Sequence, residues 1–201
     1  MDSVPTDSER RIELWRVGPA AENFPWAYKL NRFRQFLIDG EFDGPSGGQP
    51  LGPGWQGAEY GLDRASRKQA PGSFAFATFE HIIFVAESIK DEFESRFGYL
   101  GETCPVTVDG RDRDFVAFNV LAKRSCIDWA RTEVSIPMAP TRVVADLSGV
   151  SEGELFHDIG TQGGSLFSVE GPEGRGLRAI CQEKGWTGLH FQKWFPPKEA
   201  V

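Results

Sequence analysis

The stretch Arg124–Val134, RSCIDWARTEV, places a cysteine, an aspartate and a tryptophan within four residues. A cysteine beside a carboxylate could act as a nucleophile if a base lay within hydrogen-bonding distance and the pKa of its thiol were lowered. Three histidines could supply that base: His81, His157 and His190. Distance along the chain does not choose among them, because catalytic groups are assembled in space. Since Ile127 and Trp129 flank this region, we expect Cys126 to be a small buried side chain.

The familiar motifs of catalytic and metal sites are absent from the sequence. There is no HExxH or CxxC spacing for zinc, no GxSxG, and no GxGxxG following a strand. His157 and Asp158 are adjacent, and on a strand their side chains would point to opposite faces. The segment 44–57 holds nine Gly or Pro in fourteen residues but lacks the Gly-Lys-Ser/Thr ending of a phosphate loop, so we interpret it as a long surface loop. We therefore expect no catalytic residue, no metal and no cofactor.

Composition narrows the classes of partner. The 201 residues carry a formal net charge of −7, which disfavours nucleic acid because phosphate neutralisation needs clustered Lys and Arg. No apolar run approaches the roughly 20 residues of a membrane span, so we expect no membrane partner. Residues 1–10 are polar, lack the apolar stretch of a secretory signal, and are expected to be disordered. Three cysteines without CxxC spacing fit reduced thiols in the cytoplasm.

Apolar patterns predict the elements that would position these side chains. RIELWRV, residues 11–17, alternates and predicts a first strand. HIIFVAE predicts another, after which Ser88 would cap a helix that ends before Gly98. The apolar stripe of this helix consists of Ile89, Phe93 and Phe97. The carboxylates of the helix lie off the stripe, so we expect them on its solvated face. PVTVDG and residues 114–122 predict the next two strands.

A similar order recurs near the C-terminus. SLFSVE predicts a strand, Pro172 and Glu173 would open a helix, Gly185 would stop it, and TGLHFQKW predicts a final strand. The apolar positions of this helix are Leu177, Ile180 and Cys181. GPEGRG could receive an anion at the helix N-terminus, but it lacks a supporting lysine, and we interpret it as a turn and cap. Strand–helix–strand units thus cover 81–109 and 165–194, either as a duplication or as two uses of one unit.

Together these patterns predict an α+β fold, a mixed, strand-rich single domain with two strand–helix–strand units and long Gly/Pro loops. We divide the chain into a disordered N-terminus (1–10), an N-terminal strand and loop region (11–74) and an α+β core (75–201). The last two are expected to form one continuous domain.

Four segments of the core, taken in order, resemble a family of immunity proteins from bacterial polymorphic toxin systems. The first is IIFVAESIKDEFESRF, an apolar strand leading into a short helix. The second is FVAFNVLAKRSCIDWARTEV, and the third combines ELFHDIG with SLFSVEG. The fourth is the last helix with GWTGLHFQKW. The resemblance, to the eleventh family of the immunity-protein series, spans about residues 75–195, whereas residues 1–74 match no family pattern.

Membership of that family would imply a cytoplasmic, non-catalytic protein that binds and neutralises a cognate toxin domain. The motif positions that the resemblance marks as structural are Asn119, Cys126, Asp128, Glu133, Gly188 and Phe191. An acidic inhibitor suits a basic toxin, because opposite charge steers association. We therefore expect a toxin domain, basic in character, as the partner; the sequence leaves the oligomeric state open.

Acidic and aromatic residues in or beside the Gly/Pro loop are the expected contact with the partner, because exposed aromatic residues often anchor protein interfaces. These are Glu41, Asp43, Trp55, Glu59, Tyr60 and Asp63. Two alternatives remain open. One is a small cytosolic hydrolase or transferase of unknown substrate that uses Cys126 or His157 with Asp128. The other is a regulatory protein-binding module without a toxin partner.

Overall fold

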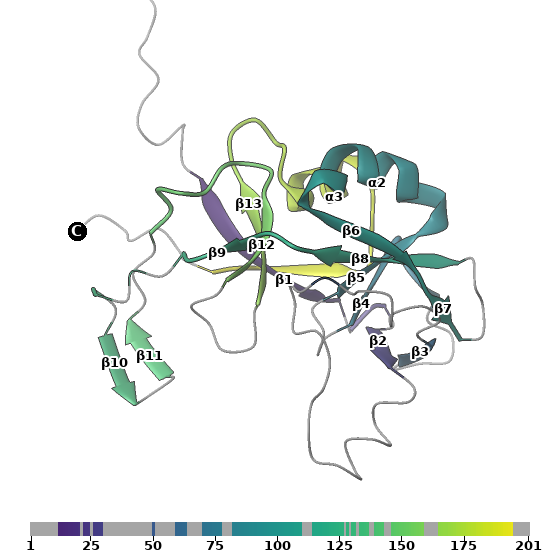
Figure 1. The fold of residues 1–201 in the computed structure, drawn as a ribbon, viewed down its shortest axis with the longest axis horizontal. Coiled ribbons are helices and arrows are strands. Elements are labelled where there is room, and N and C mark those ends of the chain that lie inside the picture. The colour runs from purple at the N-terminus through teal and green to yellow at the C-terminus, as the bar shows by residue number, and fades with distance from the viewer. Residues whose placement is uncertain are drawn as a thin grey trace, which may run out of the picture.

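The computed structural model describes residues 12–20, 22–24, 26–29, 50, 59–63, 70–77, 82–109, 114–126, 128, 130–131, 133–136, 139–142, 146–158 and 165–194. For residues 26–29, 59, 63, 133–136 and 139–142 it describes the backbone alone. The strands form a five-stranded sheet, a seven-stranded sheet and a two-stranded hairpin, and helices accompany the sheets (Figure 1). The predicted strand-rich α+β class is confirmed. Within the described segments, no helix is long and apolar enough to cross a bilayer.

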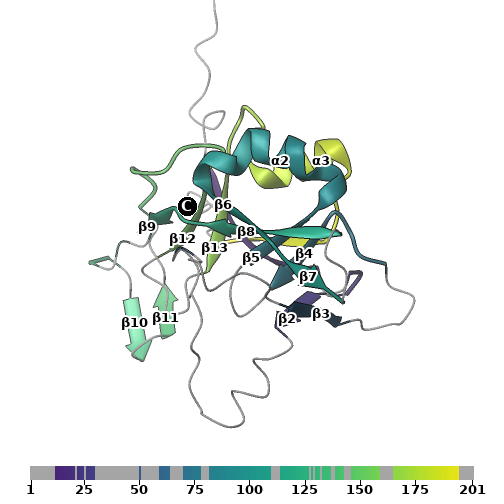
Figure 2. The ribbon, with the colours of Figure 1, turned by 45° about the vertical axis from the view of Figure 1, so that its right-hand side comes forward.

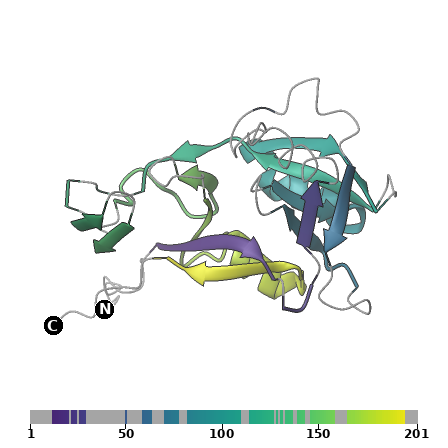
Figure 3. The ribbon, with the colours of Figure 1, turned by 90° about the horizontal axis from the view of Figure 1, so that it is seen from below.

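The five-stranded sheet has the order β14-β1-β13-β12-β9. Its strands are β1 (Glu13–Pro19), β9 (Lys123–Arg124), β12 (Leu155–Asp158), β13 (Leu166–Glu170) and β14 (Leu189–Lys193). The early strand β1 lies between two late strands and is antiparallel to both. Figure 3 shows β1 and β14 side by side in purple and yellow. The strands predicted at RIELWRV and TGLHFQKW are therefore confirmed, and they pair with each other.

The seven-stranded sheet has the order β6-β8-β5-β4-β2-β3-β7. Its strands are β2 (Trp26–Lys29), β3 (Glu59–Asp63), β4 (Phe74–Ala77), β5 (Ile82–Ala86), β6 (Gly101–Pro105), β7 (Thr107–Val108) and β8 (Phe115–Val120). Its two outermost strands, β6 and β7, are parts of one segment separated only by Val106. One end of that segment pairs with β8 and the other with β3, so the sheet curls back on itself like a small barrel.

The inside of this curl is a compact apolar cluster. Tyr60 and Phe84 lie edge to face in it, with ring centroids 4.7 Å apart. Three small residues leave room for the two rings: Ala75, Ala77 and Ala117. Asp109, at φ 50°, closes the end of β7 by accepting the Leu62 N–H at 3.0 Å. The packing of large against small side chains fills the interior, as is usual in small barrels.

Two short helices lie side by side and share one core (Figure 2). They are α2 (Lys90–Phe97), preceded by the 3-10 helix η3 (Glu87–Ile89) and followed by η4 (Gly98–Leu100), and α3 (Leu177–Lys184). Phe93 of α2 packs against Phe118 of β8 at 4.9 Å between ring centroids. Lys184 reaches Glu92 at 2.8 Å, which links the helices at the surface. The predicted apolar faces of both helices are confirmed.

The other face of the five-stranded sheet carries a third cluster. Its buried members are Leu14, Cys126, Val150, Phe156, Phe167 and Val169. Successive residues of β13 alternate between this cluster and the core below the helices, because strand side chains point to opposite faces in turn. The hairpin of β10 (Glu133–Ile136) and β11 (Ala139–Arg142) pairs with neither sheet among the described strands and stands apart in Figure 1.

The two predicted strand–helix–strand units have the same topology. In the first, β4, β5, α2 and β6 follow one another, and β8 lies between β5 and β6. In the second, β12, β13, α3 and β14 follow one another, and β1 lies between β13 and β14. Each helix has eight residues and is followed by a Gly-aromatic-x-Gly sequence. The inserted strand comes from later in the chain in one unit and from its start in the other.

Helix α3 begins on side chains that β13 supplies. The buried Ser168 hydroxyl accepts the N–H of Leu177 at 3.1 Å and donates to Glu170 Oε1 at 2.7 Å. Glu170, with only 5% of its surface exposed, accepts the next two backbone N–H groups of the helix, at 3.0 and 3.1 Å. These are donors that a helix leaves unsatisfied at its N-terminus, where negative charge is also favourable. The place where GPEGRG could have held an external anion is therefore occupied by an internal carboxylate.

Two predicted helix starts are wrong. Pro172 and Glu173 do not open α3, which begins at Leu177; residues 171–176 form a turn held by Glu152, which accepts the N–H groups of Glu173 and Arg175. Ser88 lies inside η3, and the helix α2 that follows has no side-chain cap. In both places local preference was overridden, since tertiary contacts decide where a short helix begins.

Replacing Glu170 by alanine should destabilise the protein by about 2 kcal/mol, because two partly buried backbone N–H groups of α3 lose their acceptor. The free energy of unfolding in urea measures the effect. Glu173→Gln, on the exposed turn beside the same helix, is the matched control and should change stability little. Equal stability of Glu170→Ala and the control would show that this carboxylate does not anchor α3.

A glycine joins the two sheets at close range. Gly188, at φ 108°, precedes β14, and a Cβ there would lie 2.0 Å from the carbonyl oxygen of Phe74 in β4. Next to it, the Phe74 N–H donates to the carbonyl of Thr187 at 2.8 Å. Both the backbone conformation and the close approach require a residue without a side chain.

Gly188→Ala should therefore lower the free energy of unfolding by about 2 kcal/mol or more. Gly18→Ala serves as the control, since Gly18 lies in β1 and a Cβ there would meet nothing within 4 Å. Thermal unfolding of both variants compares them directly. A Gly188 variant as stable as the Gly18 variant would contradict the close approach of the two sheets at this point.

Candidate functional site

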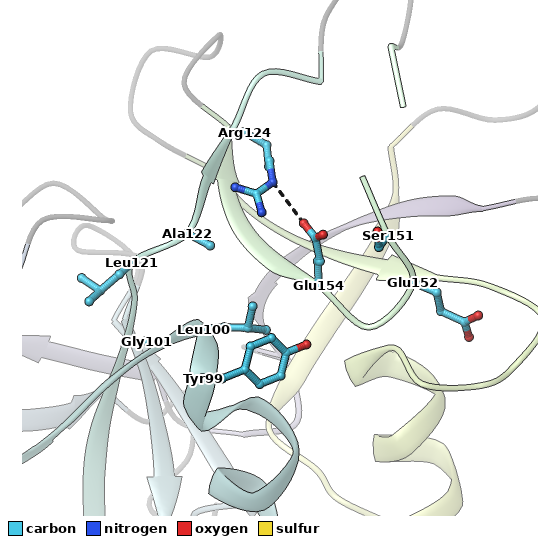
Figure 4. Close-up of a pocket in the computed structure, with 9 residues that line it drawn as sticks. All are labelled: Tyr99, Leu100, Gly101, Leu121, Ala122, Arg124, Ser151, Glu152 and Glu154. Atoms are coloured by element: carbon cyan, nitrogen blue, oxygen red, sulfur yellow. Dashed lines mark hydrogen bonds and ion pairs between the residues drawn. The ribbon is translucent and has the colours of Figure 1, made fainter. Parts of the chain in front are cut away.

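An open cleft of about 480 Å³ lies at the junction of the two sheets (Figure 4). Its walls come from three segments: η4 with the start of β6, the link from β8 to β9, and the turn before β12. The residues that line it are Tyr99, Leu100, Gly101, Leu121, Ala122, Arg124, Ser151, Glu152 and Glu154. The link 121–124 matters most to its position, because here the chain leaves one sheet and enters the other.

Tyr99 is the most exposed large apolar side chain in the described part of the chain, with 75% of its surface open to solvent. The corresponding aromatic residue of the second unit, Trp186, packs on Phe74 with ring centroids 5.7 Å apart. Both follow the glycine after an eight-residue helix. The aromatic residue at this position is packed in the second unit and exposed in the first. The topology that the two units share therefore does not require Tyr99 to be exposed. Exposed aromatic side chains of this kind are typical contact residues.

The opposite wall of the cleft is charged. The Arg124 Nε donates to Glu154 Oε2 at 3.2 Å, with 39% and 15% of the two side chains exposed. Glu152 binds two backbone N–H groups of the 171–176 turn and forms no ion pair with any described residue. The Glu152 carboxylate points away from Tyr99 (Figure 4), so the charged groups that face the cleft are the paired Arg124 and Glu154.

Three of the six contact residues predicted from the sequence lie in the described part of the chain, and none of these three lines the cleft. Glu41, Asp43 and Trp55 fall outside the described residues. Glu59 and Asp63 are at the ends of β3, where the backbone alone is described. Tyr60 was expected beside an exposed loop, and this is wrong: it is 0% exposed, inside the curled sheet. Its side chain is therefore not available to a partner.

The positions marked by the family resemblance make internal contacts where their side chains are described. Asn119, 1% exposed, donates from Nδ2 to Glu102 Oε1 at 2.9 Å. Asp128 accepts the N–H of Arg131 at 3.2 Å and pairs with its guanidinium at 3.8 Å. Phe191 packs at the edge of the core below the helices, and Gly188 has the role given above. For Glu133, in β10, the side chain lies outside the described set.

The surroundings of Cys126 and Cys181 disfavour the thiolate form that a nucleophilic cysteine needs. Cys126 is fully buried, and burial together with the neighbouring carboxylate of Asp158 raises the pKa of its thiol far above the usual range. Asp158 also accepts the Cys126 backbone N–H at 3.2 Å, so the carboxylate facing this cysteine is not that of Asp128. Burial likewise raises the pKa of Cys181 to about 12. A thiol that stays protonated at neutral pH is a poor nucleophile.

His157, the other candidate for catalysis, is 1% exposed in β12. Because successive side chains of a strand point to opposite faces, His157 and Asp158 lie on opposite faces of β12, as the sequence indicated. In the described segments, no group of three or more His, Cys, Asp or Glu residues is placed to hold a metal ion.

No protein-family model matches the chain, and no curated protein matches it. The resemblance to immunity proteins stays a prediction that depends on four short segments. The sequence patterns did not predict that Tyr99, Arg124 and Glu154 line one cleft. One signal could have singled out Tyr99: GYLG at 98–101 parallels GWTG at 185–188, yet only the first aromatic residue is a tyrosine, which tolerates solvent.

In the folded protein, iodoacetamide at pH 7.5 should modify Cys126 and Cys181 at least about 100-fold more slowly than in guanidinium, because both thiols are buried and protonated. Cys104, which is partly exposed, should react ahead of them. Peptide mapping by mass spectrometry follows each thiol separately. Rapid modification of Cys126 in the folded state would revive the nucleophile hypothesis.

Proposed function

We propose that this protein is a non-catalytic binding protein that neutralises a cognate toxin domain in the cytoplasm, as immunity proteins do. The observation that carries the proposal is Tyr99, 75% exposed at the edge of an open cleft that the Arg124–Glu154 pair also lines. An aromatic anchor beside a pocket is the usual centre of a protein interface. Neither a cofactor, a metal, a membrane nor a nucleic acid has a part in this proposal.

The helix that leads to Tyr99 supports a basic partner. Glu92 of α2 is engaged by Lys184 and Arg96. Asp91 and Glu94, on the same helix, pair with no cation among the described residues. Helix α2 carries three carboxylates, Asp91, Glu92 and Glu94, against Lys90 and Arg96, a formal excess of one negative charge in a chain whose formal net charge is −7. Such a surface would steer a basic toxin toward the cleft and accelerate association.

The two alternatives have less support. A small hydrolase or transferase that uses Cys126 would need a thiolate, and burial opposes one. A regulatory module without a toxin partner would use the same cleft, so a second observation must separate it from an immunity protein. A gene for a secreted toxin next to the gene of this chain would favour the immunity role.

The test begins with co-purification of the tagged protein from its native cell, identification of the bound chain, and preparation of that chain as a recombinant domain. The wild-type protein should bind it and abolish its activity. Association should slow by about threefold to tenfold in the double variant Asp91→Asn/Glu94→Gln, and also as salt rises from 50 to 300 mM, because both weaken steering. Stopped-flow measurements give both rates.

Glu173→Gln, which removes one exposed charge far along the chain from α2, is the matched control. Binding without inhibition of the partner's activity would favour the regulatory module. A rate of association that is insensitive to both salt and the double variant would remove the basic partner from the proposal.

A further inference from the structure

The floor of the cleft is apolar although it is built largely from backbone. Leu100 lies 7% exposed beneath Tyr99, beside Leu121 and Ala122. The Leu100 carbonyl already accepts the N–H groups of Leu121 at 2.9 Å and Ala122 at 3.4 Å. The Ala122 carbonyl accepts the N–H of His157 at 2.8 Å. With these acceptors occupied, the floor would favour an aliphatic chain over a polar group.

The walls suit a cationic head group at the end of such a chain. Tyr99 offers an exposed aromatic ring, which attracts a guanidinium or ammonium group. Glu154, across the cleft, already binds one guanidinium, that of Arg124, through Oε2 (Figure 4). Glu152 also lines the cleft, but its carboxylate points away from Tyr99 and binds the 171–176 turn, so Glu154 is the carboxylate available to a bound cation.

We propose that the Tyr99 cleft binds an arginine side chain presented by the partner protein. Its aliphatic part would lie on Leu100, Leu121 and Ala122, while its planar guanidinium stacks on Tyr99 and bonds to Glu154. Arginine fits better than lysine, because only the guanidinium combines stacking with forked hydrogen bonding to a carboxylate. Arg124, already 39% exposed, shares Glu154 with the incoming group or turns outward to solvent. The identity of the partner rests on the proposed function, but the chemistry of the cleft does not.

The direct test uses N-acetyl-arginine amide as the probe and NMR spectra of the ¹⁵N-labelled protein as the readout. Amide shifts at Tyr99, Leu100 and Glu154 should saturate with a dissociation constant of about 1–10 mM, as expected for a small ligand. N-acetyl-citrulline amide has nearly the same shape without the charge, and it should bind at least about fivefold more weakly. N-acetyl-glutamate amide should produce no saturating shifts.

Substitutions then distinguish a bound cation from a bound anion, because removing Glu154 or Arg124 should change the affinity for the probe in opposite directions. Tyr99→Ala and Glu154→Gln should each weaken binding of the arginine probe at least about threefold, and Tyr99→Phe should keep it. Arg124→Gln should leave binding unchanged or tighten it, because Glu154 loses its internal competitor. Thermal unfolding of each variant shows whether the fold is retained; these side chains are half-buried or exposed, apart from Glu154.

Equal binding of the citrulline and arginine probes would overturn the inference, and so would weaker binding in Arg124→Gln with the glutamate probe preferred. The outcome is independent of the toxin. If the arginine probe binds here but no toxin is neutralised, the proposed function fails and the cleft remains an arginine site. If a toxin is neutralised equally well by wild type and Tyr99→Ala, and the probe does not bind, the function stands without this inference.

Discussion

The start of helix α3 on Glu170 and Ser168 is the contact on which the rest of the architecture depends. β13 is buried on both faces; its Ser168 accepts the first N–H group of the helix that follows, and Glu170 accepts the next two. A shift of Glu170 would move α3, and with it the cover of the core shared by both sheets. The turn after α3 then passes within van der Waals distance of β4 at Gly188, so the helix position also sets how the sheets meet. The cleft lies at a different meeting point of the two sheets, where β8 leads into β9.

The two strand–helix–strand units have the same topology, so equivalent positions can be compared within one molecule. Each places a helix of eight residues over a common core and then returns through a Gly-aromatic-x-Gly turn. In the second unit the aromatic residue fills space between Phe74 and Phe93. In the first unit the equivalent residue, Tyr99, faces solvent. A large aromatic side chain that is seen to be exposed is a better functional candidate than one chosen by its place in a loop.

The carboxylates of this acidic chain divide into two groups with different physical roles. Several are internal acceptors for backbone or side-chain donors: Glu152, Glu170, Asp109 and Asp158. Others, such as Asp91 and Glu94 on α2, form no ion pair within the described part of the chain. The net charge of −7 is therefore not a measure of the charge available to a partner. Two of the carboxylates without an ion pair, Asp91 and Glu94, lie on α2, the helix that leads through η4 to Tyr99, and this location connects them to the proposed interface.

The sequence by itself determined the class of the fold, the strands at residues 13–17, 82–86 and 189–193, and the apolar faces of both helices, because these depend on local periodicity. It also determined the end of α3 at Gly185, because glycine readily adopts the left-handed backbone conformation found there. It also indicated that Cys126 is buried. Only the tertiary structure decided that β1 enters the last sheet, that Tyr60 points inward, and that α3 begins at Leu177 on a carboxylate from β13. These outcomes depend on contacts between residues far apart in the chain. The same is true of the cleft that Tyr99, Arg124 and Glu154 line together. Periodicity carries no information about such contacts, because it records which face of an element is apolar and not which element covers it.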